Sequence, residues 1–208
     1  MSLLPKFAKS HIYPPLSQVP ANSFPNTVEV FLDYACPFSA KIFKNWYNEL
    51  FPKLDPAKHR FIFKSYVQPW HPTSNLLHEA AIAFQYIQPE EFLKFSYLLF
   101  DSIEEFYDTN TADLTRNEIY EKIYNDIVEP NFPKVNRSDY LSLLTIIKTT
   151  EKHRNNGNAV TNDLKWFTKN GRQQGIHVTP TVVINGYEDS SIESSTPSEV
   201  VYEKLAKL

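Results

Sequence analysis

Cysteine and glycine are scarce in this chain. Of its 208 residues, one is cysteine, Cys36, and four are glycine. One cysteine excludes an intramolecular disulfide and supplies too few thiolates for a zinc or iron–sulfur site, which fits a reducing compartment. Four glycines form no glycine-rich phosphate loop, and the six histidines lack the spacing of metal ligands. We therefore expect neither a bound metal nor a tightly bound cofactor.

The chain also lacks an excess of charge and a long apolar run. Lys and Arg number 21 against 24 Asp and Glu, which argues against nucleic acid or a membrane surface as a partner. No apolar run is long enough to span a bilayer, and residues 1–26 lack the apolar core of a signal peptide. With 42% hydrophobic residues, the sequence predicts a soluble, globular and cytoplasmic protein.

The first half of the chain carries a strand–helix–strand pattern. Residues 1–26 are rich in proline and polar residues, so we expect an arm that packs on the surface or frays. Alternating apolar residues predict strands at 27–33 and 59–67. Between them, Pro37 opens a helix at or next to Cys36. This order predicts a βαβ unit with parallel strands.

A long helical segment follows. Thr115 and Glu118 form a capping box that predicts one helix start, and Ser138 is the expected N-cap of a helix over 138–153. Thr196 and Glu199 form a second box, with Pro197 at N1, before the last helix.

Strand chemistry returns near the end of the chain. Gly171 is the expected C-cap of a helix that starts near residue 158. Asn185-Gly186 then predicts a hairpin between a strand at 181–184 and a short strand near 191–193. The predicted elements follow the order of a thioredoxin fold with a helical insertion. A strand–helix–strand unit comes first, a set of helices follows, and the chain ends with a helix, two strands and a helix.

Two motifs strengthen that interpretation. The stretch "FLDYACPFS" after the first strand and "GIHVTPTVVING" near the end resemble the DSBA-like thioredoxin family. Relatives in this family include the kappa-class glutathione transferases and the 2-hydroxychromene-2-carboxylate isomerases. The resemblance implies an α/β fold with a four-stranded thioredoxin sheet and an all-helical domain inserted between the βαβ and ββα halves. It covers nearly all of residues 27–208.

The same resemblance implies a division of the chain into parts. After the N-terminal arm, 1–26, the thioredoxin-fold domain comprises 27–73 and 156–208. The inserted helical domain comprises 74–155.

The chain departs from the family at one position, because the second active-site cysteine is replaced by Ser39. A thiol at a helix N-terminus has its thiolate stabilised by the helix dipole, so Cys36 is the expected nucleophile. A serine hydroxyl cannot resolve a mixed disulfide, which excludes self-resolved dithiol exchange. An external thiol such as glutathione would then act as resolver and co-substrate. Ser39 is expected to donate a hydrogen bond to the Cys36 thiolate.

Other residues are expected to line a substrate site. In the resembled family the proline of the Val-Thr-Pro motif is cis and lies beside the active-site cysteine, so Thr179 and Pro180 should face Cys36. The alternative is an ordinary trans proline at the start of a strand. A thiol or disulfide substrate, or an extended peptide, would also meet the motif residues Pro37 and Phe38.

The loop after the second strand adds further candidates. Parallel strands place both carboxyl ends at one sheet edge, so Trp70 and His71 could line the same pocket. His71 would act as a base or a thiolate partner, or else only cap the turn. Asp33 either assists proton transfer or simply ends its strand.

Three classes of function remain open. The first is a monothiol enzyme that uses glutathione, either a thiol–disulfide oxidoreductase or a transferase or isomerase of the kind found among the relatives. In the transferases and isomerases the first position of the motif is usually serine, so the cysteine found there in this chain favours redox chemistry. The second class is a non-catalytic peptide-binding module. The third is a structural protein in which Cys36 is a buried hydrophobe and the site is vestigial.

Overall fold

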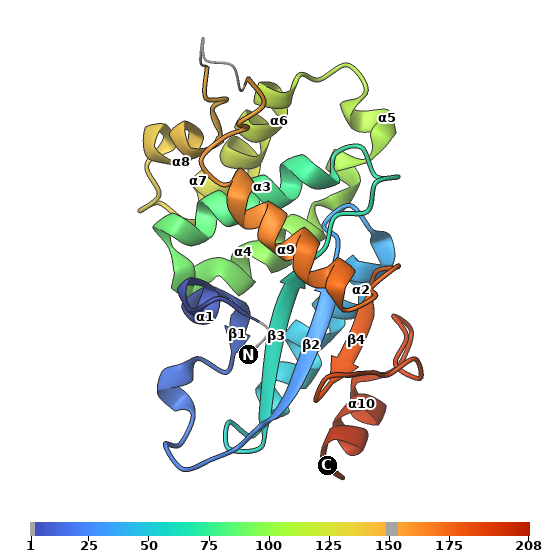
Figure 1. The fold of residues 1–208 in the computed structure, drawn as a ribbon. Helices are drawn as coiled ribbons and strands as arrows, with labels where there is room; N and C mark the ends of the chain where they lie inside the picture. The colour runs from blue at the N-terminus through green and yellow to red at the C-terminus, as the bar shows by residue number, and fades with distance from the viewer. Residues whose placement is uncertain (1–2, 149–153) are drawn as a thin grey trace.

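A five-stranded mixed sheet forms the centre of the computed structural model, which describes residues 3–148 and 154–208 (Figure 1). The strand order is β1-β3-β2-β4-β5, and β2 and β3 are parallel while the other neighbours are antiparallel. The strands are β1 (Ile12–Tyr13), β2 (Asn26–Leu32), β3 (His59–Ser65), β4 (Thr181–Ile184) and β5 (Tyr187–Glu188). The predicted βαβ unit and α/β class are confirmed.

Helices cover both faces of this sheet and its upper end. The α-helices are α1 (Ala8–His11), α2 (Pro37–Asn45), α3 (Ser74–Ile87), α4 (Phe92–Asp101), α5 (Asp108–Thr111), α6 (Arg116–Ile123), α7 (Glu129–Asn131), α8 (Arg137–Leu144), α9 (Thr161–Gln173) and α10 (Ser198–Leu205). Helices α2 and α6 continue as π-helical turns over Trp46–Leu50 and Tyr124–Val128. Short 3₁₀ segments lie at Pro5–Phe7, Leu16–Gln18, Phe51–Lys53, Pro89–Glu91 and Ile103–Phe106.

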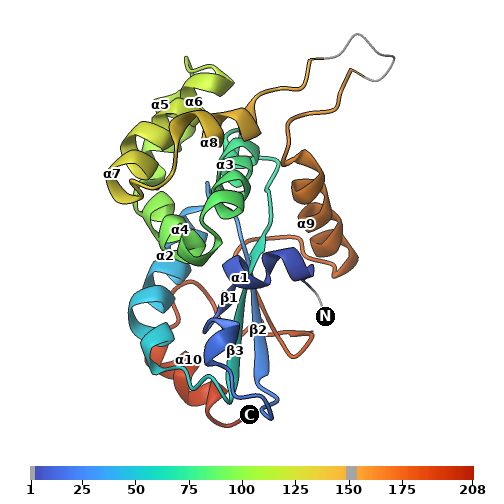
Figure 2. The same cartoon turned by 90° about the vertical axis from the view of Figure 1, so that its left-hand side faces the viewer.

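The alternation of side chains along β2 divides the core. Val28 and Val30 pair in register with Phe61 and Phe63 and point to one face of the sheet. There the Phe43 ring of α2 lies 5.4 Å from Phe63. Figure 2 shows α2 and α10 on this side and α9 on the other. Both faces are therefore buried, as the continuous apolar character of the central strands requires.

The opposite face holds a buried ion pair. Glu29 and Lys64 lie there under α9, with Lys64 Nζ 3.3 Å from Glu29 Oε1 and both side chains almost fully buried. Lys64 also donates to Asn170 Oδ1 at 3.0 Å and lies over the Trp166 ring. These contacts attach α9 to the sheet.

A helical layer from α3 to α8 lies beyond the carboxyl ends of β2 and β3 (Figure 1). Its core is aromatic, with Phe84 stacked on Phe95 at 4.4 Å. Tyr34, just after β2, reaches into this layer, where its buried hydroxyl lies 2.7 Å from Ser96 Oγ. A side chain two positions before Cys36 is thereby packed against the helical layer.

The N-terminal segment differs from the expected surface arm. Residues Ile12 and Tyr13 pair with β3 and make the sheet five-stranded rather than four-stranded. Phe7 and His11 are fully buried, and the His11 ring stacks on Phe92 at 4.0 Å. Asp163 of α9 accepts hydrogen bonds from Lys6 and Tyr86. The prediction of a surface arm relied on the proline-rich composition of the segment, which does not reveal that a few of its side chains are buried.

Three helix ends differ from the sequence predictions. The Thr115–Glu118 capping box is present, but the next helix is capped by Asn136 instead of Ser138 and ends at Leu144. The last predicted residues of that helix, 149–153, lie outside the described residues. Gly171 does not end α9, which continues to Gln173. A glycine is needed at this position for another reason, since a Cβ atom there would overlap the Tyr66 ring.

The C-terminal region carries two further corrections. Strand β5 starts directly after Asn185-Gly186, since a two-residue turn makes Tyr187 the partner of Ile184. The Thr196 hydroxyl accepts from the Glu193 N–H at 2.9 Å, and the predicted capping box is absent, because α10 starts after Pro197 without a side-chain cap.

Candidate active site at the start of helix α2

Cys36 is the N-cap residue of α2. Its backbone is extended, with φ −92° and ψ 118°, and Pro37 occupies the first helical position. The Cys36 carbonyl accepts the first helical hydrogen bond, from Ala40 N–H at 3.0 Å. The thiol thus lies at the positive end of the helix dipole, where a thiolate is stabilised. Cys36 is buried, with 4% of its residue surface exposed.

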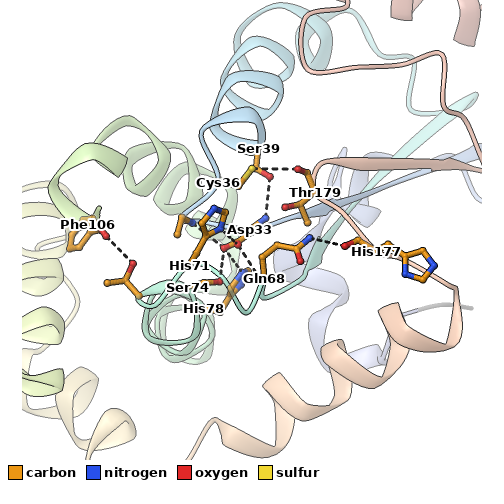
Figure 3. Close-up of polar contacts among 12 residues, drawn as sticks. Asp33, Cys36, Ser39, Gln68, His71, Ser74, His78, Phe106, His177 and Thr179 are labelled. Atoms are coloured by element: carbon orange, nitrogen blue, oxygen red, sulfur yellow. Dashed lines mark hydrogen bonds and ion pairs between the residues drawn. The ribbon is translucent and has the colours of Figure 1, made fainter. Parts of the chain in front are cut away.

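The Thr179–Pro180 loop lies against this thiol. Cys36 Sγ donates to the Thr179 carbonyl at 3.4 Å, and the peptide bond between Thr179 and Pro180 is cis (Figure 3). The segment before this loop is held by Tyr66, whose Oη donates to the Ile176 carbonyl at 2.6 Å. Gln68 Nε2 donates to the His177 carbonyl at 3.3 Å. Two segments 143 residues apart in sequence therefore meet at one sulfur atom.

Ser39 occupies the third helical position and is fully buried. Its hydroxyl oxygen accepts a hydrogen bond from the Asp33 N–H at 3.2 Å (Figure 3). The predicted hydrogen bond from Ser39 to Cys36 does not occur among the described contacts. The serine instead helps to hold the loop between β2 and α2.

Asp33 is the centre of a buried polar network. Its fully buried carboxylate accepts from His71 Nδ1 at 2.7 Å and from Ser74 Oγ at 2.5 Å (Figure 3). It also accepts from the backbone N–H groups of Ala35 at 3.0 Å and Gln68 at 3.2 Å. One carboxylate thus joins the motif loop to the loop that follows β3.

The charge of Asp33 is favoured by these partners. Burial acts to raise the pKa of Asp33, but His78, His71 and Ser74 outweigh it and lower the pKa below the ordinary value of 3.8. His78 Nε2 lies 3.7 Å from the carboxylate, and its ring is fully buried. The aspartate is therefore ionised at neutral pH.

Three exposed apolar side chains surround the thiol segment. Phe38 follows Pro37 and is 61% exposed, Val178 precedes Thr179 and is 57% exposed, and Trp70 is 59% exposed. The Trp70 ring is 6.1 Å from the His71 ring, and most of its surface is exposed. Exposed apolar groups beside a reactive group commonly mark a binding surface.

Two cavities open beside Pro37 on the side of the inserted helices. One of about 310 Å³ is lined by Ala35, Pro37, His71 and Tyr107, among others. A larger one of about 700 Å³ extends from Pro37 and Tyr107 along α2. Burial raises the pKa of Tyr107, and its electrostatic interactions with Glu104 and Cys36 raise it further. Tyr107 thus lies within electrostatic reach of the thiol.

Sequence reasoning missed part of this site. It named Asp33 without its network, and it did not single out Ser74 or Tyr107. A serine at the start of a helix and a tyrosine in a helical insertion carry no motif, so their position became visible only in three dimensions. Within residues 3–148 and 154–208 there is no group of three acidic, cysteine or histidine side chains placed to hold a metal ion.

A comparison with protein families identifies the chain. The model described as thioredoxin matches residues 21–201. The chain belongs to the thioredoxin family. A search of curated proteins finds no match. Across the two described ranges, no helix has the length and apolar character needed to cross a membrane.

Solved structures share the fold of this thioredoxin-family chain. A candidate protein-disulfide isomerase from Pseudomonas syringae has a TM-score of 0.70 and 24% identity, covering 87% of this chain and 93% of that one. The thiol-disulfide exchange protein alpha-DsbA2 from Wolbachia pipientis has a TM-score of 0.59 and 18% identity, covering 91% and 84%. Chlamydia trachomatis DsbA has a TM-score of 0.59 and 15% identity, covering 100% and 95%. The predicted DsbA-like thioredoxin fold is confirmed.

Proposed function

We propose that this chain is a monothiol thiol–disulfide oxidoreductase that acts through Cys36. The observation that carries the proposal is the helix start itself, where a buried cysteine at the N-cap, in contact with the cis-proline loop, is followed three residues later by a buried serine. The cysteine retains its place at the start of the helix, next to the Thr179–Pro180 loop. The serine removes the internal resolving thiol.

The cycle needs two external sulfur compounds. The Cys36 thiolate attacks a disulfide R–S–S–R, forms a Cys36–S–S–R mixed disulfide and expels RS⁻. A second thiol, R′SH, then loses its proton and attacks the sulfur of R. The S–S bond to Cys36 breaks with its electron pair on Cys36, and R–S–S–R′ leaves. Glutathione is a suitable R′SH because it is a small external thiol.

The surroundings favour a substrate with an extended, apolar segment. Phe38, two residues after Cys36, and Val178, next to Thr179, are exposed, and the Thr179 carbonyl lies beside the sulfur. An extended peptide could contact both side chains and pair with the backbone of the Thr179 loop. We infer a thiol or disulfide on such a segment as the substrate.

Mass spectrometry after treatment with oxidised glutathione tests this function. The native protein is expected to gain one glutathione on Cys36, and Cys36→Ser is expected to gain none. Ser39→Cys is expected to release the glutathione and form an internal disulfide, since the restored thiol lies one helical turn away. A native Cys36 that takes up no glutathione, while the unfolded chain reacts normally, would overturn the proposal.

A non-catalytic peptide-binding module is the second candidate. It is favoured by the exposure of Phe38, Trp70 and Val178 around a sulfur that is itself mostly buried. A module of this kind would bind an extended apolar peptide equally well as wild type and as Cys36→Ser. Peptide binding that is retained in Cys36→Ser, together with an inert native thiol, would select this function over catalysis.

A further inference from the structure

The ring of His71 is held by Asp33 with one nitrogen left over. Nδ1 lies 2.7 Å from the Asp33 carboxylate, and because that carboxylate is ionised, Nδ1 carries the proton and donates it. A ring whose single proton is on Nδ1 has an acceptor lone pair on Nε2. In the part of the chain that the structure describes, Nε2 has no hydrogen-bond partner. The His71 side chain is 23% exposed, whereas Asp33 is fully buried.

The exposed side of this ring borders the smaller cavity beside the motif. That cavity, about 310 Å³, is lined by His71 together with Ala35 and Pro37, the two neighbours of Cys36. It is large enough for the thiol end of a small molecule. Asp33 joins the two walls, since it accepts from Ala35 N–H as well as from His71.

The position of His71 is well determined. Asp33 is itself fixed by Ser74 and by the backbone of Gln68, so the carboxylate cannot turn away from the ring. The titratable groups around this pair come from several elements. They are Cys36 at the start of α2, His78 on α3, Tyr107 after the Ile103–Phe106 turn and Asp108 on α5.

We propose that His71, positioned by Asp33, is the general base that deprotonates the external resolving thiol. This inference rests on the proposed monothiol cycle and names the group that replaces the missing second cysteine. The thiol R′SH enters the cavity, and its proton moves to His71 Nε2. The R′ thiolate forms a bond with the sulfur of R in Cys36–S–S–R, and the electron pair of the broken bond goes to Cys36. His71 then returns the proton to the Cys36 thiolate or to water.

The chemistry requires such a group. Only the thiolate attacks a disulfide, and an aliphatic thiol with a pKa near 8.5 is mostly protonated at neutral pH. A thiol that arrives from solution brings no base of its own. A positioned general base contributes a rate factor of about 10² to 10⁴.

The test measures how fast the glutathione adduct of Cys36 is resolved by two different thiols. The adduct is prepared in denaturant and refolded, so that loading does not depend on the reactivity of native Cys36. Glutathione serves as the protonated attacker and thionitrobenzoate as an attacker that is already a thiolate. His71→Asn is the main variant, because its amide nitrogen can still donate to Asp33. His177→Asn is the control, since that exposed side chain lies in the neighbouring loop.

We expect His71→Asn to slow resolution by glutathione at least tenfold and resolution by thionitrobenzoate less than twofold, with His177→Asn unchanged for both, as general-base catalysis requires. Asp33→Asn should show the same selective loss. Equal slowing with both thiols would assign His71 a structural role and overturn the proposal. Unchanged rates with glutathione would overturn it as well.

A second measurement needs no variant. The ratio of the glutathione rate to the thionitrobenzoate rate should be at least tenfold higher for the native adduct than for the same adduct in urea, where His71 is not positioned. Equal ratios would contradict a general base. If native Cys36 fails to load while the refolded adduct shows the selective effect, the proposed function fails and the role of His71 stands.

Discussion

The hydroxyl of Ser39 accepts the backbone N–H of Asp33 at 3.2 Å, although the two residues belong to different parts of the motif region. The bond joins the third residue of α2 to the end of β2, one residue beyond the last hydrogen-bonded pair of that strand. Ser39 therefore has a structural contact of its own, in addition to marking the place of a missing thiol.

Ser39→Ala is expected to destabilise the protein. The substitution leaves the buried Asp33 N–H without an acceptor, which costs about 1–3 kcal/mol. The free energy of unfolding in urea measures this effect. Ser142→Ala, at an exposed position of α8, is the matched control and should change the free energy far less. An equal effect of the two variants would show that the Ser39 bond adds nothing to stability.

Asp33→Asn is expected to change the dependence of stability on pH. The pKa of Asp33 is lower in the folded protein than in the unfolded chain, so its ionised form stabilises the fold above the unfolded-state pKa. That contribution is lost as the pH falls through the folded-state pKa. Below about pH 4, wild type should lose stability more steeply than Asp33→Asn. Urea titrations at a series of acidic pH values measure the slope, with the exposed Asp113→Asn as control.

Gly171→Ala is expected to act against the usual trend. Alanine normally stabilises a helix by about 0.5–1 kcal/mol relative to glycine. At Gly171 a Cβ atom would overlap the ring of Tyr66, whose hydroxyl holds the Thr179 loop through Ile176. Thermal unfolding should therefore show a lower melting temperature for Gly171→Ala. Lys169→Ala, on the exposed side of the same helix, provides the comparison; a higher melting temperature for Gly171→Ala would contradict the contact.

The ion pair of Glu29 and Lys64 gives a prediction about buried charge. Replacing Glu29 by Leu removes the carboxylate that balances the charge of a fully buried lysine and should destabilise the fold by about 3–5 kcal/mol. Adding Lys64→Met should restore most of that loss, because it also removes the positive charge that Glu29 balanced. Unfolding in urea compares the single and double variants. An additive loss in the double variant would mean that the two side chains stabilise the protein independently.

The main elements of the fold could be predicted from local pattern, and the exceptions have physical causes. Alternation gave β2 and β3, and the Thr115 box marked the start of α6. The edge strand β1 has two residues, too few to show a period. The sequence pattern around Gly171 predicted a helix end, whereas a glycine is needed there because the ring of Tyr66, just after β3 and far away in sequence, contacts it.

The site was partly accessible to the same reasoning. The motif pointed to Cys36 and Thr179, which the fold brings together. The network of Asp33 was not accessible, since its donors come from two loops and a helix start and share no sequence pattern. The exposure of these side chains could not be predicted either. Trp70 is mostly exposed, whereas His71 and His78 lie beside the Asp33 carboxylate.

The distance in sequence between Cys36 and Thr179 has a consequence for synthesis on the ribosome. The two residues are 143 positions apart, and β4, which carries the loop to the thiol, pairs with β2 only after almost the whole chain has been made. At typical elongation rates, on the order of ten seconds separate the emergence of Cys36 from that of its covering loop. During that interval the nascent chain presents an uncovered thiol. The thiol of the nascent chain can therefore react with an oxidant or a disulfide before the loop that would select its substrate is in place.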